Sequence, residues 1–279
     1  MQNLFTFLLP FLSSPITWYI LAFGACIGSF LNVCIIRIPQ GTFWASQRSK
    51  CPHCQASIPF WHNIPVLSWL ILRGKAACCG GRISAQYPIV EFLTGVIFVL
   101  AYWQFPFLKS MQPSLVIDSG DLIRFFHAVI FSSLLLTCSV IDLHHQIIPD
   151  KISLPMVALT PLVVYFHPDL DWRSALIGVV AGAGVLYVIA WAYFLLRREA
   201  GLGMGDVKLL AGIGGWLGYQ SLLPTLFIGS ISGAVIGIIF MMFNRSMTMK
   251  TALPFGPFLS LGAWLHLMYG QEIQEFLLF

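Results

Sequence analysis

Apolar residues run through most of this chain in blocks long enough to cross a lipid bilayer, separated by short polar segments. Five blocks have the roughly 17–25 residues that a spanning helix needs. They cover residues 16–36, 87–105, 125–141, 174–196 and 222–243. Three shorter blocks, 152–166, 207–217 and 255–268, can also span if they are buried in a bundle or end in a water-filled recess. The pattern predicts an all-α polytopic membrane protein of about eight transmembrane helices, with six or seven as alternatives.

The composition agrees with a membrane protein. Of the 279 residues, 58% are hydrophobic and only 9% are charged. The first fifteen residues contain two prolines and no basic segment, so we do not interpret them as a cleaved signal peptide.

One segment, residues 37–86, is too polar for the bilayer. It is rich in Pro, Gly, Cys and Trp and has six basic residues and no acidic one. We therefore expect an N-terminal segment with the first transmembrane helix over 1–36, a small Cys-containing loop domain over 37–86, and a transmembrane bundle over 87–279.

Basic residues fall mainly on one side of the predicted bundle. Twelve of the fifteen Lys and Arg lie in the loops 37–82, 144–151, 197–208 and 244–250. The opposite side has only Lys109, Arg124 and Arg173. The positive-inside rule makes the first group of loops cytoplasmic and puts both termini outside. The net charge of +4 thus reflects topology, and nothing in it indicates nucleic acid as a partner.

Small residues recur in the predicted spans 16–36 and 174–196. Gly24, Gly28 and Ser29 share one side of the span 16–36, and Gly178, Gly182 and Ala183 lie in the span 174–196. Small residues at such spacing let helix backbones approach closely in lipid, so we interpret them as packing positions. Asn32 lies deep in the first span and needs a polar partner; it either links helices or shapes a site.

Acidic residues near the spans need a reason, because an ionised side chain in a span costs roughly 2.5–3.5 kcal/mol. The cytoplasmic candidates are Glu91, Asp142, Asp150, Glu199 and Asp206. The others fall in outer loops or the C-terminal tail, where we expect solvation to explain them: Asp118, Asp121, Asp169, Asp171, Glu272 and Glu275.

Asp142 directly follows the predicted span 125–141, and Asp206 directly precedes the predicted span 207–217. Two carboxylates from different helices at one depth can share a proton and activate a water for peptide hydrolysis. Three alternatives stay open: Asp206 is only a helix N-cap, Asp142 is only solvated, or the two carry protons in a transporter.

Glycines precede Asp206 at every second position, at 201, 203 and 205. They leave the backbone without side-chain bulk and free to adopt positive φ, as expected where an extended substrate must come close. A bare N-cap does not need three of them, although a flexible hinge would also use them.

Six segments of the chain together resemble a known family. They read GSFLNVCIIRIP, NIPVLSWLILRGK, RISAQYPIVEFLTG, SVIDLHHQIIPDKISLP, GMGDVKLL and PFGPFLSLGA, and they extend from Gly28 to Ala263. In this order they are similar to the bacterial type IV prepilin leader peptidases, which are membrane aspartyl proteases with a Gly-x-Gly-Asp motif.

The resemblance implies a bifunctional enzyme of the bacterial inner membrane, with its active site facing the cytoplasm. It would cut the basic leader from type IV prepilins and type II secretion pseudopilins, and then methylate the new N-terminal amine with S-adenosylmethionine. By motif, the catalytic pair would be Asp142 and Asp206. The alternatives are a membrane aspartyl peptidase without methylation, or a proton-coupled transporter with the same aspartates.

Helix dipoles suggest how the two aspartates would differ. Asp206 stands at a helix N-terminus, which favours the ionised form, and Asp142 at a helix C-terminus, which disfavours it. Our hypothesis is that Asp206 starts as the base and Asp142 as the acid, although a close pair titrates as a unit.

The loop domain contains Cys51 and Cys54 in CPHC and Cys78 and Cys79 in KAACCGG. Two C-x-x-C pairs would indicate zinc, but alignment through GGRIS puts Ala76 where the family has its third cysteine. Either Cys78 replaces the lost ligand, or three thiolates are completed by His53, His62 or water, or no metal binds. A disulfide is disfavoured in a reducing compartment.

Methyl transfer rests on the resemblance alone, since no glycine-rich nucleotide-binding fingerprint is present. Glu91 is the acid we would test for holding the amine or the cofactor; its alternative role is to anchor Arg82 or the loop. We interpret Lys208 as an interfacial residue, Asp150 as a helix cap, and His144 and His145 as solvated. Three further cysteines in spans, Cys26, Cys34 and Cys138, are interpreted as small buried apolar residues.

Overall fold

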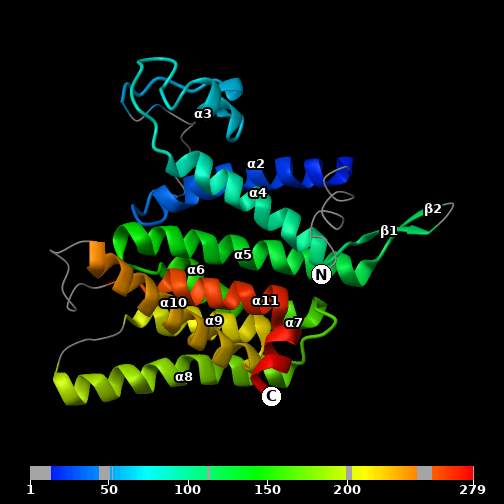
Figure 1. Ribbon diagram of the computed structural model, residues 1–279, viewed down its shortest axis with the longest axis vertical. Coiled ribbons are helices and arrows are strands. Elements are labelled where there is room, and N and C mark those ends of the chain that lie inside the picture. Colours follow the sequence, from blue (N-terminus) through cyan, green and yellow to red (C-terminus); the bar gives the residue numbers. More distant parts are fainter. Residues whose placement is uncertain are drawn as a thin grey trace. The chain divides into compact units, whose positions relative to one another are not determined.

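The computed structural model (Figure 1) describes residues 14–43, 51, 53–111, 114–198, 203–243 and 253–278. Nearly all regular structure in these residues is helical, as predicted. The chain forms two compact units, Met1–Pro106 and Phe107–Phe279. The domain boundary after residue 86 that we expect from the sequence separates the loop domain from the helices that follow it, and it stays a prediction.

The first unit is a pair of long helices with a small domain between them in sequence. Helices α2 (Pro15–Arg37) and α4 (Gln86–Gln104) pack together, and the domain holds the short helices η1 (Phe60–Asn63) and α3 (Leu67–Ile71). A Cβ added to Gly24 would lie 2.9 Å from the Cα of Gly95, and one on Gly28 only 2.7 Å from the Cα of Glu91. The predicted role of these glycines in close helix packing is confirmed.

The second unit begins with an antiparallel hairpin that the apolar pattern did not predict. Strands β1 (Leu108–Met111) and β2 (Ser114–Ile117) pair with Leu108 opposite Ile117. The helices that follow are α5 (Ser119–His145), α6 (Asp150–Ala158), α7 (Thr160–Phe166), α8 (Trp172–Arg197), α9 (Met204–Leu217), η2 (Tyr219–Ser221), α10 (Leu222–Phe243) and α11 (Gly256–Leu278).

Five helices in the described part of the chain are long and apolar enough to cross a membrane. They are α2, α4, α5, α8 and the segment Tyr219–Phe243 that contains α10. The predicted span 152–166 is broken into α6 and α7, α9 has only 14 residues, and α11 is kinked at Tyr269. The polytopic fold is confirmed, whereas the count of eight spans is not.

Helix α9 lies at the centre of the second unit. It contacts α6, α7, α8, α10 and α11, and every residue from Leu209 to Trp216 is buried. Its 14 residues extend about 21 Å, less than the roughly 30 Å of a bilayer core. This helix is therefore too short to cross a bilayer by itself, although the bundle surrounds it.

Two glycines explain how closely α8 approaches α9. A Cβ on Gly178 would collide with the carbonyl of Gly214, and one on Gly182 would lie 2.6 Å from the carbonyl oxygen of Leu210. The packing role predicted for the small residues of this span is confirmed. On the far side of α9, the Trp216 indole N–H donates to the Met156 carbonyl at 2.8 Å and ties the helix to α6.

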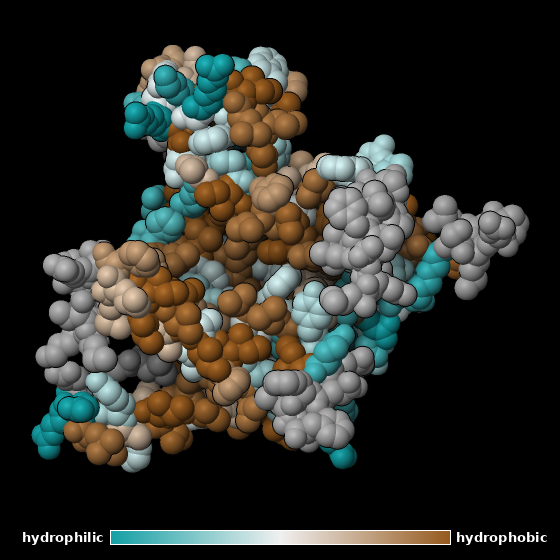
Figure 2. Space-filling model, in the orientation of Figure 1, coloured by the Kyte–Doolittle hydropathy of each residue, from teal (hydrophilic) through white to brown (hydrophobic). Residues whose placement is uncertain are grey.

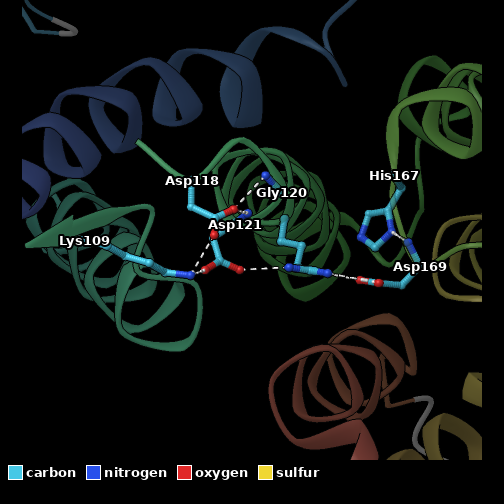
Figure 3. Close-up of polar contacts among 7 residues, drawn as sticks. Lys109, Asp118, Gly120, Asp121, His167 and Asp169 are labelled. Carbon is cyan, nitrogen blue, oxygen red and sulfur yellow. Dashed lines mark hydrogen bonds and ion pairs between the residues drawn. The ribbon is translucent and has the colours of Figure 1, made fainter. Parts of the chain in front are cut away.

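Around the N-terminus of α5, acidic side chains for which we expected only solvation form a chain of ion pairs (Figure 3). Lys109 contacts Asp118 at 2.7 Å and Asp121 at 2.8 Å. Arg124 contacts Asp121 and holds Asp169 with two hydrogen bonds of 2.6 and 3.0 Å. The Arg124 guanidinium holds the pKa of Asp169 below its usual value, and Lys109 does the same to the pKa of Asp118. The chain joins the hairpin, α5 and the loop before α8.

The α8–α9 contact predicts a difference between two glycines of one helix. Gly178→Ala must push α8 away from Gly214 and should cost about 1–3 kcal/mol of stability, as overpacking does. In the purified protein, intrinsic tryptophan fluorescence should show a clear drop in Tm.

The matched control is Gly184→Ala, because a Cβ at Gly184 meets nothing within 4 Å. It should leave Tm unchanged or raise it slightly, since Ala favours helix over Gly. Equal Tm values for the two variants would contradict this account of the packing.

Candidate active site

Asp142 lies in the last turn of α5 and is buried, with 5% of its surface exposed. The helix ends just beyond it, at Gln146, whose φ is 53°. One carboxylate oxygen of Asp142, Oδ2, accepts a hydrogen bond of 2.9 Å from the backbone N–H of Gly256. Gly256 is the first residue of α11, so an N-terminal helix amide holds this carboxylate in place.

Asp206 lies in the first turn of α9, three residues after the N-cap Gly203, and is 9% exposed. Its backbone N–H donates to the Gly203 carbonyl at 3.1 Å. A Cβ on Gly203 would lie 3.2 Å from Oδ2 of Asp206, which shows that the carboxylate folds back over the helix start. Unpaired amides and the helix dipole stabilise negative charge at this position.

Both carboxylates line one cavity of about 230 Å³. Its walls are the end of α5, the loop that follows and the start of α9: Asp142, Gln146, Ile147, Ile148, Asp150, Gly203, Met204, Gly205 and Asp206. This volume has room for several water molecules. Two carboxylates that line one cavity with room for water can divide the roles of general acid and general base.

The glycines before Asp206 act differently from our expectation. Gly203 has φ −74° and Gly205 lies within the helix, so positive φ is wrong as the reason for both, while Gly201 lies outside the described residues. A Cβ on Gly205 would lie 2.9 Å from the Cβ of Ile148. Glycine at 205 therefore allows the loop after α5 to lie against the start of α9, which brings the two acids to one cavity.

The Gly256 contact bears on which aspartate holds the proton at rest. The sequence alone puts Asp142 next to one helix end, the C-terminus of α5. In the structure its carboxylate accepts an amide from the N-terminus of α11 as well. The dipoles of α5 and α11 therefore oppose each other at Asp142, and helix dipoles do not by themselves identify the base.

Asp150 and Lys208 form an ion pair beside the cavity, with 2.6 Å between Nζ and Oδ1. Asp150 is the first residue of α6, whose N-cap is Pro149, and no side-chain cap is formed. The cap predicted for Asp150 is wrong, whereas the interfacial role of Lys208 stays a prediction. His144 and His145 are exposed as expected, and Glu199 lies outside the described residues.

Glu91 is buried in the first unit, with 7% of its surface exposed. Its Oε2 accepts a hydrogen bond of 2.7 Å from the backbone N–H of Val66. The carboxylate thus anchors the loop through Val66 rather than through Arg82. Asn32 is only half satisfied: its Nδ2 donates to the carbonyls of Gly28 and Tyr87 at 3.3 and 3.1 Å, whereas its buried Oδ1 accepts no hydrogen bond from the described residues.

The four loop cysteines lie together. Their sulfur atoms are all within 4.8 Å of one another, with Cys51 3.7 Å from Cys79 and Cys54 3.3 Å from Cys78. Four thiolates at about 2.3 Å from a tetrahedral zinc would be about 3.8 Å apart. The donor set therefore fits zinc, and it agrees with the first of the three alternatives, in which Cys78 replaces the lost ligand. His53 is engaged elsewhere, with its Nε2 3.0 Å from the Arg82 carbonyl oxygen.

The two cysteine segments have the same backbone turn. In the first, the Cys51 N–H donates to the Ala56 carbonyl at 2.8 Å, and the Gln55 N–H donates to the Cys51 carbonyl at 2.9 Å. Gln55 has φ 60°. In this turn the backbone amides of Cys54 and His53 lower the pKa of the Cys51 thiol to about 6, which favours a thiolate ligand.

The second turn repeats these contacts with alanine at its start. The Ala76 N–H donates to the Gly81 carbonyl, and the Gly80 N–H donates to the Ala76 carbonyl, both at 2.7 Å. Gly80 has φ 70°. Ala76 thus occupies the place of Cys51 in the repeated turn, and Cys79 that of Cys54. The alignment that identified Ala76 as the altered position is consistent with this geometry.

The remaining cysteines are in helices. Cys34 and Cys138 are buried, as expected, but Cys26 is exposed on α2, where burial was predicted.

Comparison with known proteins gives a consistent result for both units. Residues 22–105 match the model of the bacterial peptidase A24 N-terminal domain, and residues 129–238 match that of the type IV leader peptidase family. Relatives named prepilin leader peptidase/N-methyltransferase include that of Stutzerimonas stutzeri, 34% identical over 94% of both chains. That of Xanthomonas campestris pv. campestris is 33% identical over 90% of this chain and 91% of its own.

The relative from Pseudomonas aeruginosa with the same name is 32% identical over 90% of this chain and 89% of its own. No solved structure matches. Identity at this level over nearly the full length, together with the two domain matches, establishes that the chain belongs to the type IV leader peptidase family.

Proposed function

We propose that this protein removes the leader peptide from type IV prepilins and N-methylates the new N-terminal residue. The observation that carries the proposal is the pair of buried carboxylates, Asp142 and Asp206, from two helices lining one cavity. The names and near full-length similarity of the relatives support both activities.

In the proposed cleavage, one aspartate takes a proton from a water in the cavity, and the water attacks the scissile carbonyl. The other aspartate starts protonated, polarises that carbonyl and gives its proton toward the oxygen that becomes negative. The C–N bond then breaks as the first aspartate passes its proton to the leaving amine, and the second aspartate regains its proton from a hydroxyl of the collapsing intermediate. Because a close pair titrates as a unit, the two share one proton at rest.

The cavity would face the cytoplasm of a bacterium, with the chain in the inner membrane. The distribution of Lys and Arg supports this orientation, and the pairing of Lys208 with Asp150 keeps a basic residue beside the cavity. Pseudopilins of type II secretion are the second substrate group that we propose.

For the second activity, S-adenosylmethionine would supply the methyl group. Glu91 is the residue we propose for holding the new amine or the cofactor, because it is the only acidic residue in the first 117 positions. Its anchoring bond to Val66 occupies one carboxylate oxygen.

We also propose that zinc is held by Cys51, Cys54, Cys78 and Cys79. The sulfur positions support this set. The metal would be structural, because four thiolates leave no open position for a substrate.

Loss of either catalytic aspartate should abolish cleavage without unfolding the protein. Asp142→Asn and Asp206→Asn should each lower the rate about 100-fold or more. Purified protein would be incubated with a prepilin and labelled S-adenosylmethionine, so that cleavage and methylation are read together. Asp171→Asn, at the N-cap of α8, is the control and should cleave normally. Near-parental cleavage by either active-site variant would exclude the pair, and cleavage without methylation would indicate a peptidase alone.

The Gly256 amide predicts a more subtle effect. A Cβ at this position would lie 2.7 Å from Oδ2 of Asp142, so Gly256→Ala must move the carboxylate or the start of α11. We expect kcat for leader cleavage to fall at least about tenfold, with little change in Tm. Gly184→Ala serves again as the control. An unchanged kcat would show that the contact does not position Asp142.

The repeated turn predicts how zinc can be lost and regained. Cys78→Ser should remove the fourth ligand and lower the zinc content from one per chain toward zero, measured by elemental analysis of purified protein. Adding Ala76→Cys to that variant should restore it, because Ala76 occupies the same place as Cys51. If Cys78→Ser keeps one zinc, Cys78 is not a ligand; if the parent binds none, the zinc proposal is wrong.

A further inference from the structure

The small domain of the first unit exposes an unusual number of large apolar side chains. On η1 and α3 and between them, the exposed fractions are 79% for Phe60, 55% for Trp61, 46% for Ile64, 57% for Leu67, 57% for Leu70 and 78% for Ile71. We call these six side chains the apolar face. Figure 2 shows apolar atoms gathered on one side of this domain and hydrophilic atoms on the other. Water-exposed domains rarely carry so much contiguous apolar surface unless it binds something.

Polar contacts on the inner side of the same segment fix which side chains point outward. Ser68 is buried and its hydroxyl donates to the Trp61 carbonyl at 3.1 Å. The Trp69 indole N–H donates to the Ile83 carbonyl at 3.2 Å. With Ser68 and Trp69 held inward, Leu67, Leu70 and Ile71 are left outside. The exposure is therefore a consequence of specific bonds and not of a loose segment.

The bond between Glu91 and Val66 fixes where the apolar face lies along α4. Val66 has φ 61° and ψ −52°, and the Leu67 N–H donates to the Pro65 carbonyl at 2.6 Å. This is a γ-turn with positive φ at a β-branched residue, a rare and strained conformation. The buried carboxylate of Glu91 receives the Val66 amide and holds the turn.

Glu91 is the sixth residue of α4, so the turn lies about 8 Å along the helix from its first residue. At this level α4, a helix long and apolar enough to cross a membrane, exposes Ile89 and Phe92, each 54%. The segment that carries the apolar face is therefore tied to α4 at a level where this helix exposes apolar side chains.

Charge identifies the kind of lipid surface. The residues that follow the face, Arg73 and Lys75, are exposed, and the first 106 residues contain six basic side chains and one acidic one. Aromatic side chains are enriched at the headgroup level, and basic residues near the surface attract anionic headgroups. We propose that the apolar face lies in the interfacial layer of the bilayer against anionic phospholipid, and that Glu91 holds it at this depth.

Photocrosslinking in lipid nanodiscs tests this directly. The full chain would carry p-benzoylphenylalanine at Phe60 or at Ile71, with the exposed Ala77 of the same domain as the control position. Nanodiscs would contain either phosphatidylcholine alone or a mixture with phosphatidylglycerol, and adducts would be identified by mass. We expect lipid adducts at 60 and 71, several-fold above those at 77 and more abundant in the anionic mixture.

The anchoring role of Glu91 is tested in the same assay. Glu91→Gln keeps an acceptor for the Val66 amide and should retain the adducts, whereas Glu91→Leu removes it and should reduce them several-fold. Equal yields in the two variants would overturn the anchoring role. Lipid adducts no more frequent than at 77, or crosslinks mainly to a second copy or to an added prepilin, would overturn the lipid surface itself. Prepilin cleavage plays no part in the readout, so the outcome is independent of the proposed function.

Discussion

The site in the second unit depends on keeping two carboxylates inside an apolar helical bundle. An unpaired charge in such surroundings is costly, and the fold offsets the cost with helix N-termini. Asp206 lies in the first turn of α9, and Asp142 accepts an amide from the first residue of α11. The cavity has room for water as a further partner. Since α9 is too short to cross a bilayer and is surrounded by helices, its end can lie in such a recess while its sides stay dry.

Close backbone contacts let this short helix be surrounded. Gly178 against Gly214 brings α8 onto one side of α9, and Gly205 against Ile148 brings the end of α5 to its start. In lipid, apolar burial alone gives little force between helices, so van der Waals contact between small residues has to supply it. The same device that packs the bundle therefore sets the distance between the aspartates. A larger side chain at these positions would change the cavity without touching either acid.

Long apolar blocks and isolated acids could be interpreted from the sequence because each reflects the free-energy cost of placing polar or charged groups in lipid, which depends on the segment itself. The spans at 16–36 and 222–243 match α2 and α10 almost residue for residue. Contacts between distant segments could not be predicted in this way. The Gly256 amide lies 114 residues from Asp142 in the sequence. Lys208 in α9 pairs with Asp150 in α6, and two helices, α7 and α8, separate them in the sequence. The hairpin of β1 and β2 was missed because its strands are too short for a periodic signal. The repeated turn around Ala76 became visible only from backbone hydrogen bonds.

The small domain of the first unit raises a different physical problem, because it buries very little. Among its described residues from 51 to 85, only Cys51, Ser68, Gly74 and Ala76 are buried. A segment of this size cannot form a core large enough to offset its conformational entropy. Two external supports would supply what the core lacks: a metal held by four thiolates at one end, and the bilayer against the apolar face at the other. Glu91 connects the second support to a spanning helix through one hydrogen bond. On this view the zinc and the lipid surface stabilise the same domain, and removing the metal should loosen the turn at Val66 as well as the cysteine turns.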